Sequence, residues 1–239
     1  MTATDASGLR LVDVRLTLGR LTLGADLTLT PGAMTAVIGP SGSGKSTLLS
    51  LIAGFLTPDA GTVHWNGSRI DTLPPGQRPV SVLFQDNNLF PHLTVAQNIG
   101  LAISPRLRLT ADDQLRIKAM LDQLDLGGME DRKPSSLSGG QQSRVALGRV
   151  LLSDRPVVLL DEPFAALGPG LRQQMLALAE ETLAGRTVLM VSHDPGDALT
   201  HAAETIFVTD GMVRPPQPTR VLFDQPPPEL SDYLGKGGT

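Results

Sequence analysis

Residues 39–47 read Gly39-Pro40-Ser41-Gly42-Ser43-Gly44-Lys45-Ser46-Thr47, and this segment fits the phosphate-binding pattern G-x-x-x-x-G-K-[ST]. The apolar run 34–38 predicts a buried strand before it, and residues 46–53 predict a helix after it that Gly54 closes. A glycine-rich turn between a strand and a helix directs backbone N–H groups at one point, which suits an anion. Lys45 is expected to neutralise terminal phosphates, and Ser46 to offer its hydroxyl to Mg²⁺. We therefore expect the whole of this phosphate loop to contact a nucleoside triphosphate.

A second apolar run ends in two adjacent carboxylates, in Pro156-Val157-Val158-Leu159-Leu160-Asp161-Glu162-Pro163. The carboxyl ends of parallel strands converge on the ligand crevice, so Asp161 is expected in the Mg²⁺ shell, directly or through water. Glu162 is left to polarise a water molecule for attack on the γ-phosphate. Standing alone, the pair would be better interpreted as solvated acids at a strand end. The phosphate loop favours the catalytic interpretation.

A third element is Leu137-Ser138-Gly139-Gly140-Gln141. Ser138 is a good N-cap, and the helix it starts is expected to run over residues 142–152. This is a second helix N-terminus, with two glycines that let a phosphate approach closely. An ordinary capped helix after a polar loop is the alternative interpretation. If the site is functional, the nucleotide contacts are Ser138, Gly139, Gly140 and Gln141.

These elements occur in an order that resembles the ATP-binding-cassette ATPases: the phosphate loop, Gln85, residues 137–141, Leu160-Asp161-Glu162 and His193. The resemblance covers nearly the whole chain. It implies an α/β fold, in which a phosphate-loop NTPase core carries an antiparallel β subdomain and an inserted α-helical subdomain. It also implies that two such domains sandwich two ATP molecules, each phosphate loop facing the signature helix of the other subunit. The working unit is then a dimer of ATPase subunits, expected to be a homodimer.

The resemblance also assigns roles to two single residues. Gln85 follows the strand expected at 80–84 and would contact Mg²⁺ and the attacking water. His193 follows the strand expected at 187–192 and would contact the γ-phosphate. The expected catalytic residues are thus Glu162, His193 and Gln85, and the expected Mg²⁺ ligands are Ser46, Gln85 and Asp161. The remaining histidines lack the spacing of metal ligands, and we expect no metal at His64, His92 or His201.

The chain departs from the family in two places. The loop after Glu162 reads Ala165-Ala166-Leu167-Gly168, where the family usually has an Asp that helps to couple the two sites of the dimer. Coupling is therefore expected to be weaker. The stretch 14–18 contains no aromatic residue to stack on adenine, and aliphatic packing or the Arg15 guanidinium would have to substitute. Since such stacking is worth on the order of 1 kcal/mol, nucleotide affinity is expected to be modest.

Composition is compatible with this interpretation. The chain has 239 residues, 41% of them hydrophobic, a net charge of −4 and no cysteine. These values suit one globular domain, exclude disulfides and thiol catalysis, and give no reason to expect a nucleic-acid partner. The first residues lack the features of a signal peptide, and no apolar stretch is long enough to span a membrane. We expect a cytoplasmic subunit whose membrane role runs through a partner.

The order of elements suggests a single domain, 1–239, with inner divisions. Approximately residues 1–89 and 151–214 form the nucleotide-binding core with its antiparallel β subdomain, residues 90–150 form the helical subdomain, and residues 215–239 form a short tail. Period-two apolar stretches over residues 9–29, with Gly19 and Gly24 as breaks, and an Asn66-Gly67 hairpin signal indicate the antiparallel part. Thr110 is expected to cap a helix with an apolar stripe, ended by Gly127-Gly128. The members of that stripe are Ile117, Met120, Leu121 and Leu124.

The segment Asp86–Leu101 is expected to be a loop that contacts an integral-membrane permease. Together with residues 78–85 it resembles the ATPase subunits of bacterial thiamine importers. The resemblance implies ATP and Mg²⁺ as cofactors and a peripheral position on the cytoplasmic face of the bacterial inner (plasma) membrane. It also implies a periplasmic or extracellular substrate-binding protein that acts through the permease. The alternatives are a polyamine, iron or sulfate importer, a cassette ATPase acting on DNA or ribosomes, and a degenerate regulatory cassette with weak hydrolysis.

Overall fold

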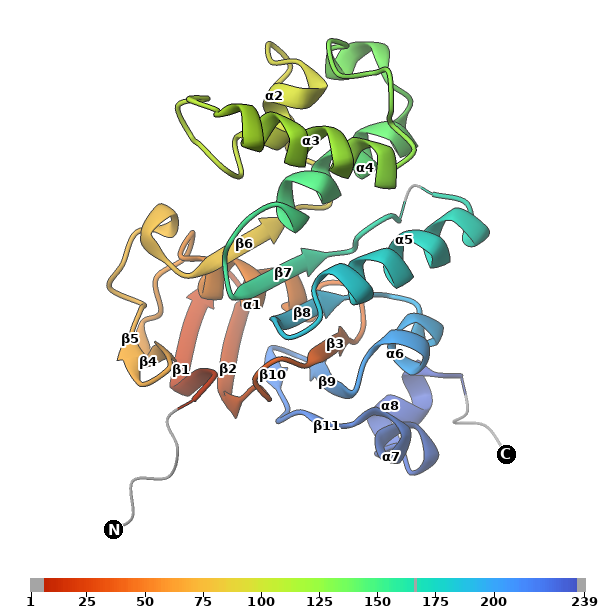
Figure 1. Ribbon diagram of the computed structural model, residues 1–239. Coiled ribbons are helices and arrows are strands. Elements are labelled where there is room, and N and C mark those ends of the chain that lie inside the picture. Colours follow the sequence, from red (N-terminus) through yellow and green to blue (C-terminus); the bar gives the residue numbers. More distant parts are fainter. Residues whose placement is uncertain (1–6, 166, 236–239) are drawn as a thin grey trace. The chain divides into compact units, whose positions relative to one another are not determined.

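The computed structural model describes residues 7–165 and 167–235 (Figure 1). Within this part of the chain, contacts divide the protein into two compact units. The core unit comprises residues 7–80, 156–161 and 184–235, and the helical unit comprises residues 81–155 and 162–183. The elements expected to bind nucleotide are therefore distributed over both units.

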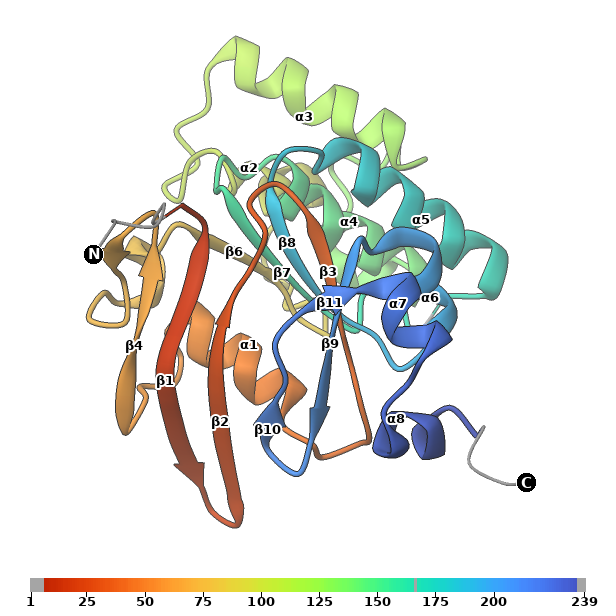
Figure 2. The ribbon, with the colours of Figure 1, turned by 90° about the horizontal axis from the view of Figure 1, so that it is seen from below.

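The core unit is built on a mixed β-sheet. Its strands are β1 (Leu9–Leu18), β2 (Leu21–Thr28), β3 (Met34–Ile38), β4 (Ala60–Trp65), β5 (Ser68–Arg69), β7 (Val157–Asp161), β8 (Thr187–Val191), β9 (Glu204–Thr209), β10 (Met212–Val213) and β11 (Gln217–Pro218). Their order is β5-β4-β1-β2-β10-β9-β3-β8-β7, and β11 pairs with β9 (Figure 2). β3 pairs in parallel with β8 and β9, and β7 in parallel with β8. β3 and β8 are buried along their whole length, as their continuous apolar runs predict.

The antiparallel part is formed by β1, β2, β4 and β5. Asn66 and Gly67 connect β4 to β5 with φ angles of 47° and 76°, as a two-residue hairpin turn of type I′ requires. The predicted antiparallel subdomain and its hairpin are thus confirmed. The expected break at Gly24 is wrong, because β2 continues through it: the Gly24 N–H donates to the Gly211 carbonyl (2.8 Å), and Gly24 pairs with both Arg15 and Met212.

The helices of the core unit are α1 (Lys45–Ala53), α6 (Pro195–His201), α7 (Thr219–Asp224) and α8 (Pro228–Tyr233), with a 3-10 turn at Pro75–Gln77. The predicted helix after the phosphate loop is confirmed, and Gly54 closes it in the left-handed conformation. Arg78, only 1% exposed, donates to the carbonyl oxygens of Leu51 and Ile52 at 2.8 and 2.9 Å. Carbonyls in the last turn of a helix lack partners within it, so this cation stabilises the end of α1.

The helical unit contains α2 (Val95–Gly100), α3 (Ala111–Gln123), α4 (Gly139–Leu151) and α5 (Pro169–Thr182), with a 3-10 turn at Pro134–Ser136, and β6 (Val80–Leu83) leads into it. The predicted cap and apolar stripe of α3 are confirmed: Thr110 forms a capping box with Asp113, and all four stripe residues are buried. The helix ends before the expected Gly127-Gly128. Asp125 takes the left-handed conformation (φ 53°), and the Leu126 N–H bonds back to the Leu121 carbonyl, which closes the helix early.

Two further expectations in the helical unit need correction. The helix after Ser138 begins at Gly139, not at residue 142, because the N-cap is followed at once by the first helical residue. The segment Asp86–Leu101 is not a loop throughout, since its second half is α2. The signal for that helix is a capping box, in which Thr94 and Gln97 each bond the other's backbone N–H.

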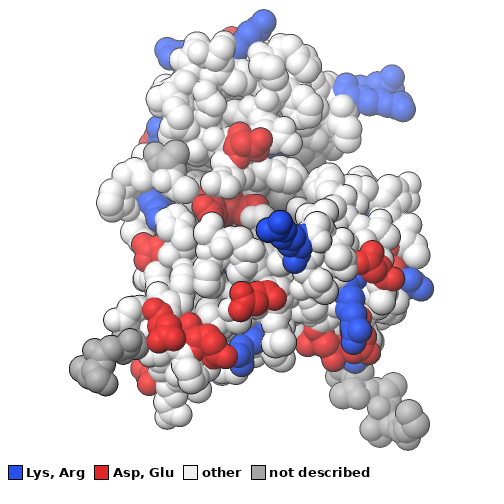
Figure 3. Space-filling view, turned by 180° about the vertical axis from the view of Figure 1, so that it is seen from behind, with Lys and Arg blue, Asp and Glu red and all other residues white. Residues whose placement is uncertain are grey.

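Among the residues that the structure describes, no helix is long and apolar enough to cross a membrane. On the face drawn in Figure 3, acidic and basic side chains are interspersed, and no large basic area is visible there.

Candidate nucleotide-binding and hydrolysis site

The phosphate loop spans the turn from β3 to α1. Gly39, Gly42 and Gly44 have φ angles of 149°, 77° and 108°, a backbone that favours glycine. A Cβ at Gly39 would lie 2.0 Å from the carbonyl oxygen of Val208, so no larger residue fits there. A Cβ at Gly42 would meet nothing within 4 Å, so the turn is open at that point. Left-handed residues in a turn before a helix are typical of concave anion sites.

Lys45 is the first residue of α1 and is only 8% exposed. Its Nζ donates to the carbonyl oxygens of Gly39 and Pro40, both at 2.8 Å. The hydroxyl of Ser43, also in this loop, is buried and has no hydrogen-bond partner among the residues that the structure describes. Buried polar groups nearly always have a partner, so a turn with a buried ammonium and an unpaired hydroxyl fits a polar, anionic ligand.

Ser46 and Asp161 lie next to each other in the core unit. The Ser46 hydroxyl donates to Asp161 Oδ1 at 3.0 Å, joining the start of α1 to the end of β7. A hydroxyl and a carboxylate are both oxygen ligands of the kind that Mg²⁺ takes. The structure thus brings together two of the three expected metal ligands.

His193 follows β8 in the core unit and is exposed. Its carbonyl oxygen accepts a hydrogen bond from Tyr233 Oη at 3.2 Å. The preceding Ser192 donates its N–H to the Val37 carbonyl of β3, the strand that enters the phosphate loop. The backbone at His193 is therefore tied to the same part of the sheet as the loop.

Gln85 and Glu162 lie together in the helical unit. Gln85 Nε2 is 3.5 Å from Glu162 Oε2, the outer limit of a hydrogen bond. Glu162 has a φ angle of 47°, and Phe164 two residues later has a φ angle of 66°. Left-handed backbone at non-glycine residues costs energy and concentrates at functional sites. The turn after Asp161 therefore holds this carboxylate in a conformation that a free chain would avoid.

The signature segment forms the N-terminus of α4. Ser138 and Gln141 make a capping box, in which the Ser138 hydroxyl accepts the Gln141 N–H and the Gln141 side chain accepts the Ser138 N–H. The next N–H groups, of Gly139 and Gly140, have no acceptor within the helix by its geometry. A Cβ at Gly139 would meet nothing within 4 Å. A Cβ at Gly140 would lie 2.9 Å from Leu167 Cδ2, so this helix end is open to an approaching anion at Gly139.

The two segments in which the sequence departs from the family lie in different parts of the structure. Leu18, at the end of the stretch without an aromatic residue, is 50% exposed and pairs with Leu21 in β2. Leu21 in turn packs beside Gly44 of the phosphate loop. In the other departure, Gly168 is the N-cap of α5 and makes no side-chain cap; Ala166 lies outside the described residues.

Two structural residues were missed at the sequence level. Asn98 is fully buried in α2 and bonds through its side chain to the backbone of Phe90, Leu93 and Thr94. Arg149 of α4 donates to the carbonyls of Asn88 (2.9 Å) and Asn87 (3.1 Å), both left-handed. Burial lowers the pKa of Arg149 from its ordinary value. Both residues hold the segment that follows Gln85. Only Asn98 had a signal in the sequence, through its position after the Thr94 cap.

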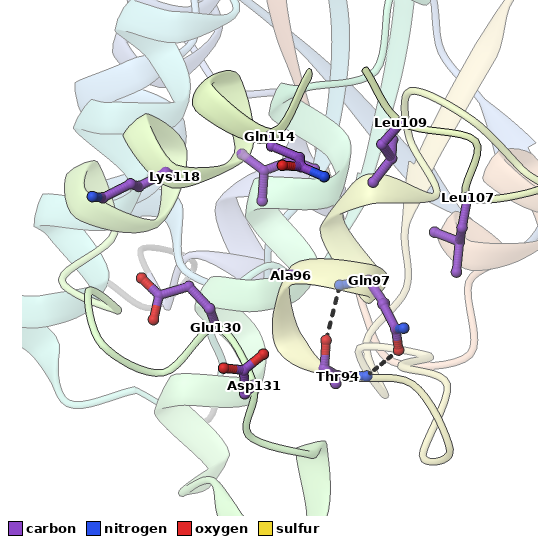
Figure 4. A pocket seen from close by; sticks show the side chains of 10 residues that line it. Thr94, Ala96, Gln97, Leu107, Leu109, Gln114, Lys118, Glu130 and Asp131 are labelled. Atoms are coloured by element: carbon purple, nitrogen blue, oxygen red, sulfur yellow. Dashed lines mark hydrogen bonds between the residues drawn. The ribbon is translucent and has the colours of Figure 1, made fainter. Parts of the chain in front are cut away.

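A cavity of about 670 Å³ opens within the helical unit, next to the N-terminus of α2 (Figure 4). It is lined by Thr94, Ala96, Gln97, Leu107, Leu109, Gln114, Ile117, Lys118, Glu130 and Asp131. The charged side chains lie at one side of the view, and Leu107 and Leu109 lie at the other.

Residues 23–165 match the family described as ABC transporter. The chain belongs to this family, and its fold is that of an ATP-binding cassette ATPase. At 58% identity over 219 residues it is similar to the thiamine import ATP-binding protein ThiQ of Cereibacter sphaeroides, covering 91% of this chain and 95% of that protein. The proteins of the same name from Ruegeria sp. and Brucella suis are 51% and 48% identical, over 95% and 98% of this chain and 99% and 98% of theirs.

Solved structures of cassettes agree with this assignment. A dimeric post-hydrolysis state of the ATP-binding cassette MJ0796 bound to ADP and Pi has a TM-score of 0.78 at 29% identity, and covers 89% of this chain and 99% of that one. A nucleotide-free ATP-binding cassette from an ABC transporter has a TM-score of 0.78 at 26% identity, covering 91% and 95%. The predicted fold class and family are confirmed.

Proposed function

We propose that this chain is the ATP-hydrolysing subunit of a bacterial importer that takes up thiamine through a separate membrane permease. The observation that carries the proposal is the 58% identity to a thiamine import ATP-binding protein, across 95% of that protein. The matches to two further proteins of that name extend over 95% and 98% of this chain.

Residues 39–47 are proposed to bind the phosphates of ATP. The buried Lys45 ammonium and the open, glycine-rich turn support this role. Ser46 and Asp161, 3.0 Å apart, together with Gln85, would hold Mg²⁺. When bound, the ion neutralises charge on the β- and γ-phosphates.

Hydrolysis is proposed to use Glu162 as the base. Glu162 accepts a proton as a water oxygen forms a bond to the γ-phosphorus, and the bond from that phosphorus to the bridging oxygen breaks, giving ADP and phosphate. Gln85 orients the water, and its contact with Glu162 at 3.5 Å supports the shared task. His193 donates to the γ-phosphate from its exposed position after β8.

The signature residues 138–141 are proposed to bind the nucleotide held by the phosphate loop of a second copy of this chain. The open helix N-terminus of α4 supports this contact, and similar cassettes are described as dimeric. Each ATP would then be enclosed by two chains, and ATP binding would favour the closed dimer.

The permease is proposed to dock on the helical unit along Asp86–Leu101. Phe90 is 44% exposed, and the cavity beside α2 includes Thr94, Ala96 and Gln97 of this segment. An exposed aromatic beside a hollow is typical of a binding surface. A substrate-binding protein on the periplasmic or extracellular side would act through the permease, and this chain would lie on the cytoplasmic face of the membrane.

Uptake into proteoliposomes tests the proposal. The chain, its permease and the substrate-binding protein should take up labelled thiamine when ATP is inside, and the Lys45→Ala variant should not. Uptake of spermidine, ferric iron or sulfate in place of thiamine would reject the proposed solute and keep the importer. ATP hydrolysis without uptake of any of these solutes would reject the importer.

A further inference from the structure

The turn Ser192–Asp194 is held from two sides in the core unit. On the inner side, the Ser192 hydroxyl donates to Asp197 Oδ2 at 2.7 Å and accepts the Asp194 N–H at 3.0 Å. On the outer side, the Tyr233 hydroxyl donates to the His193 carbonyl at 3.2 Å. The backbone around His193 is thus fixed while its imidazole stays exposed.

The inner side depends on a buried carboxylate. Asp197 is 1% exposed and Ser192 is also 1% exposed. A buried carboxylate is costly unless hydrogen bonds satisfy it, and an apolar residue would fill this place in α6 at lower cost. The Asp197 carboxylate accepts the hydroxyl of the residue before His193, so it ties α6 to that turn.

The outer side depends on the end of the described chain. The Tyr233 ring lies 6.2 Å from the Phe207 ring of β9, and Phe207 pairs with Ile38, the last residue of β3 before Gly39. Tyr233 and Leu234 pack against a buried cluster that contains Ile38, Phe207 and residues of α6, α7 and α8. The C-terminal helix α8 therefore joins the strand entering the phosphate loop to the turn that carries His193.

We propose that Tyr233 and Asp197 are positioning residues for His193. By holding the turn against β3, they set the distance from the imidazole to a phosphate on the loop. An error of about 1 Å in such a placement can reduce a rate by about a hundredfold. The inference rests on the ATP hydrolysis proposed for this chain and does not depend on the transported solute.

Tyr233→Phe is the first test because it removes one hydroxyl and keeps the ring. Loss of a single hydrogen bond is expected to lower kcat for ATP about three- to tenfold. The KM for ATP should change less than about twofold, because the phosphate loop is untouched. Asp197→Ala should lower kcat further, because it removes the shorter of the two hydrogen bonds that the Ser192 hydroxyl donates, the other being to the Asp194 carbonyl at 3.3 Å.

Glu229→Gln is the matched control. Glu229 lies on α8, like Tyr233, and holds that helix through Arg214 at 3.0 Å. This ion pair is exposed to solvent and worth little to stability, so its loss should leave the turn at His193 in place and kcat unchanged. A fall in kcat for Glu229→Gln equal to that for Tyr233→Phe would assign the effect to loss of the helix and overturn the proposal.

A double-mutant cycle with His193→Ala separates positioning from general stability. In the His193→Ala background, Tyr233→Phe should have no further effect on single-turnover hydrolysis. Equal effects of Tyr233→Phe in both backgrounds, or an unchanged kcat in the single variant, would refute the positioning role. A wild-type rate for His193→Ala would instead refute the role of His193, which is a failure of the proposed function.

Discussion

Asp161→Asn should change ATP binding in opposite directions with and without magnesium. Mg²⁺ binds oxygen ligands at about 2.1 Å, and the Ser46 hydroxyl is 3.0 Å from Asp161 Oδ1, so an ion on Ser46 lies within about 5 Å of the carboxylate. At an effective dielectric constant of about 20, unit charges at that distance interact by about 3 kcal/mol, and a divalent ion by about twice as much. Dehydration offsets much of this attraction, which leaves about 2 kcal/mol, or about thirtyfold weaker binding of Mg·ATP.

The effect of Asp161→Asn on nucleotide affinity should reverse when magnesium is removed. The Asp161 carboxylate then repels the triphosphate, so the neutral Asn variant should bind metal-free nucleotide more tightly than the parent chain does. Calorimetric titration with a non-hydrolysable ATP analogue, in magnesium and in EDTA, measures both affinities. Asp154→Asn is the control, since it removes the same charge from an exposed residue before β7. An equal loss of affinity in both conditions would refute a place for Asp161 in the ion's shell.

Three further predictions concern single residues. Glu162→Gln should keep ATP binding, lower kcat by at least about a hundredfold and trap an ATP-bound dimer detectable by gel filtration; a parental rate of hydrolysis would reject Glu162 as the base. Leu18→Tyr should tighten ATP binding about three- to tenfold, because stacking of the new ring on adenine adds about 0.5–1.5 kcal/mol. An unchanged affinity in calorimetry would mean that residue 18 does not face the adenine ring. Arg149→Gln should keep basal hydrolysis within about twofold and lose most of the stimulation by the loaded permease complex, since it releases Asn87 and Asn88; full stimulation would show that this link carries no coupling.

Much of the fold could be predicted from local signals. The strand before the phosphate loop, the helix after it and the caps at Thr110 and Ser138 follow from apolar runs and capping residues, which act over a few positions. The errors at α2 and at the ends of α3 and α4 concerned local signals at helix ends, whereas the error at Gly24 arose because a distant partner decides the local structure. Gly24 continues β2 because Gly211, far along the chain, accepts its N–H.

The candidate site shows the same division. The phosphate loop, Asp161 and Glu162 could be singled out because each belongs to a motif of residues that are adjacent in the sequence. The supporting contacts could not, since Arg149 reaches residues 61 and 62 positions away and Tyr233 reaches His193 across 40 positions. No spacing in the sequence predicts that the C-terminal helix contacts this turn.

The most direct test of the account is ATP hydrolysis by the chain reconstituted with its permease, with empty or thiamine-loaded binding protein added. We expect a low basal rate that rises severalfold with thiamine-loaded protein and stays low with the empty form. The rise should disappear in Lys45→Ala. A rate that does not respond to thiamine, in a preparation where Lys45→Ala abolishes hydrolysis, would contradict the proposed link between this ATPase and thiamine import.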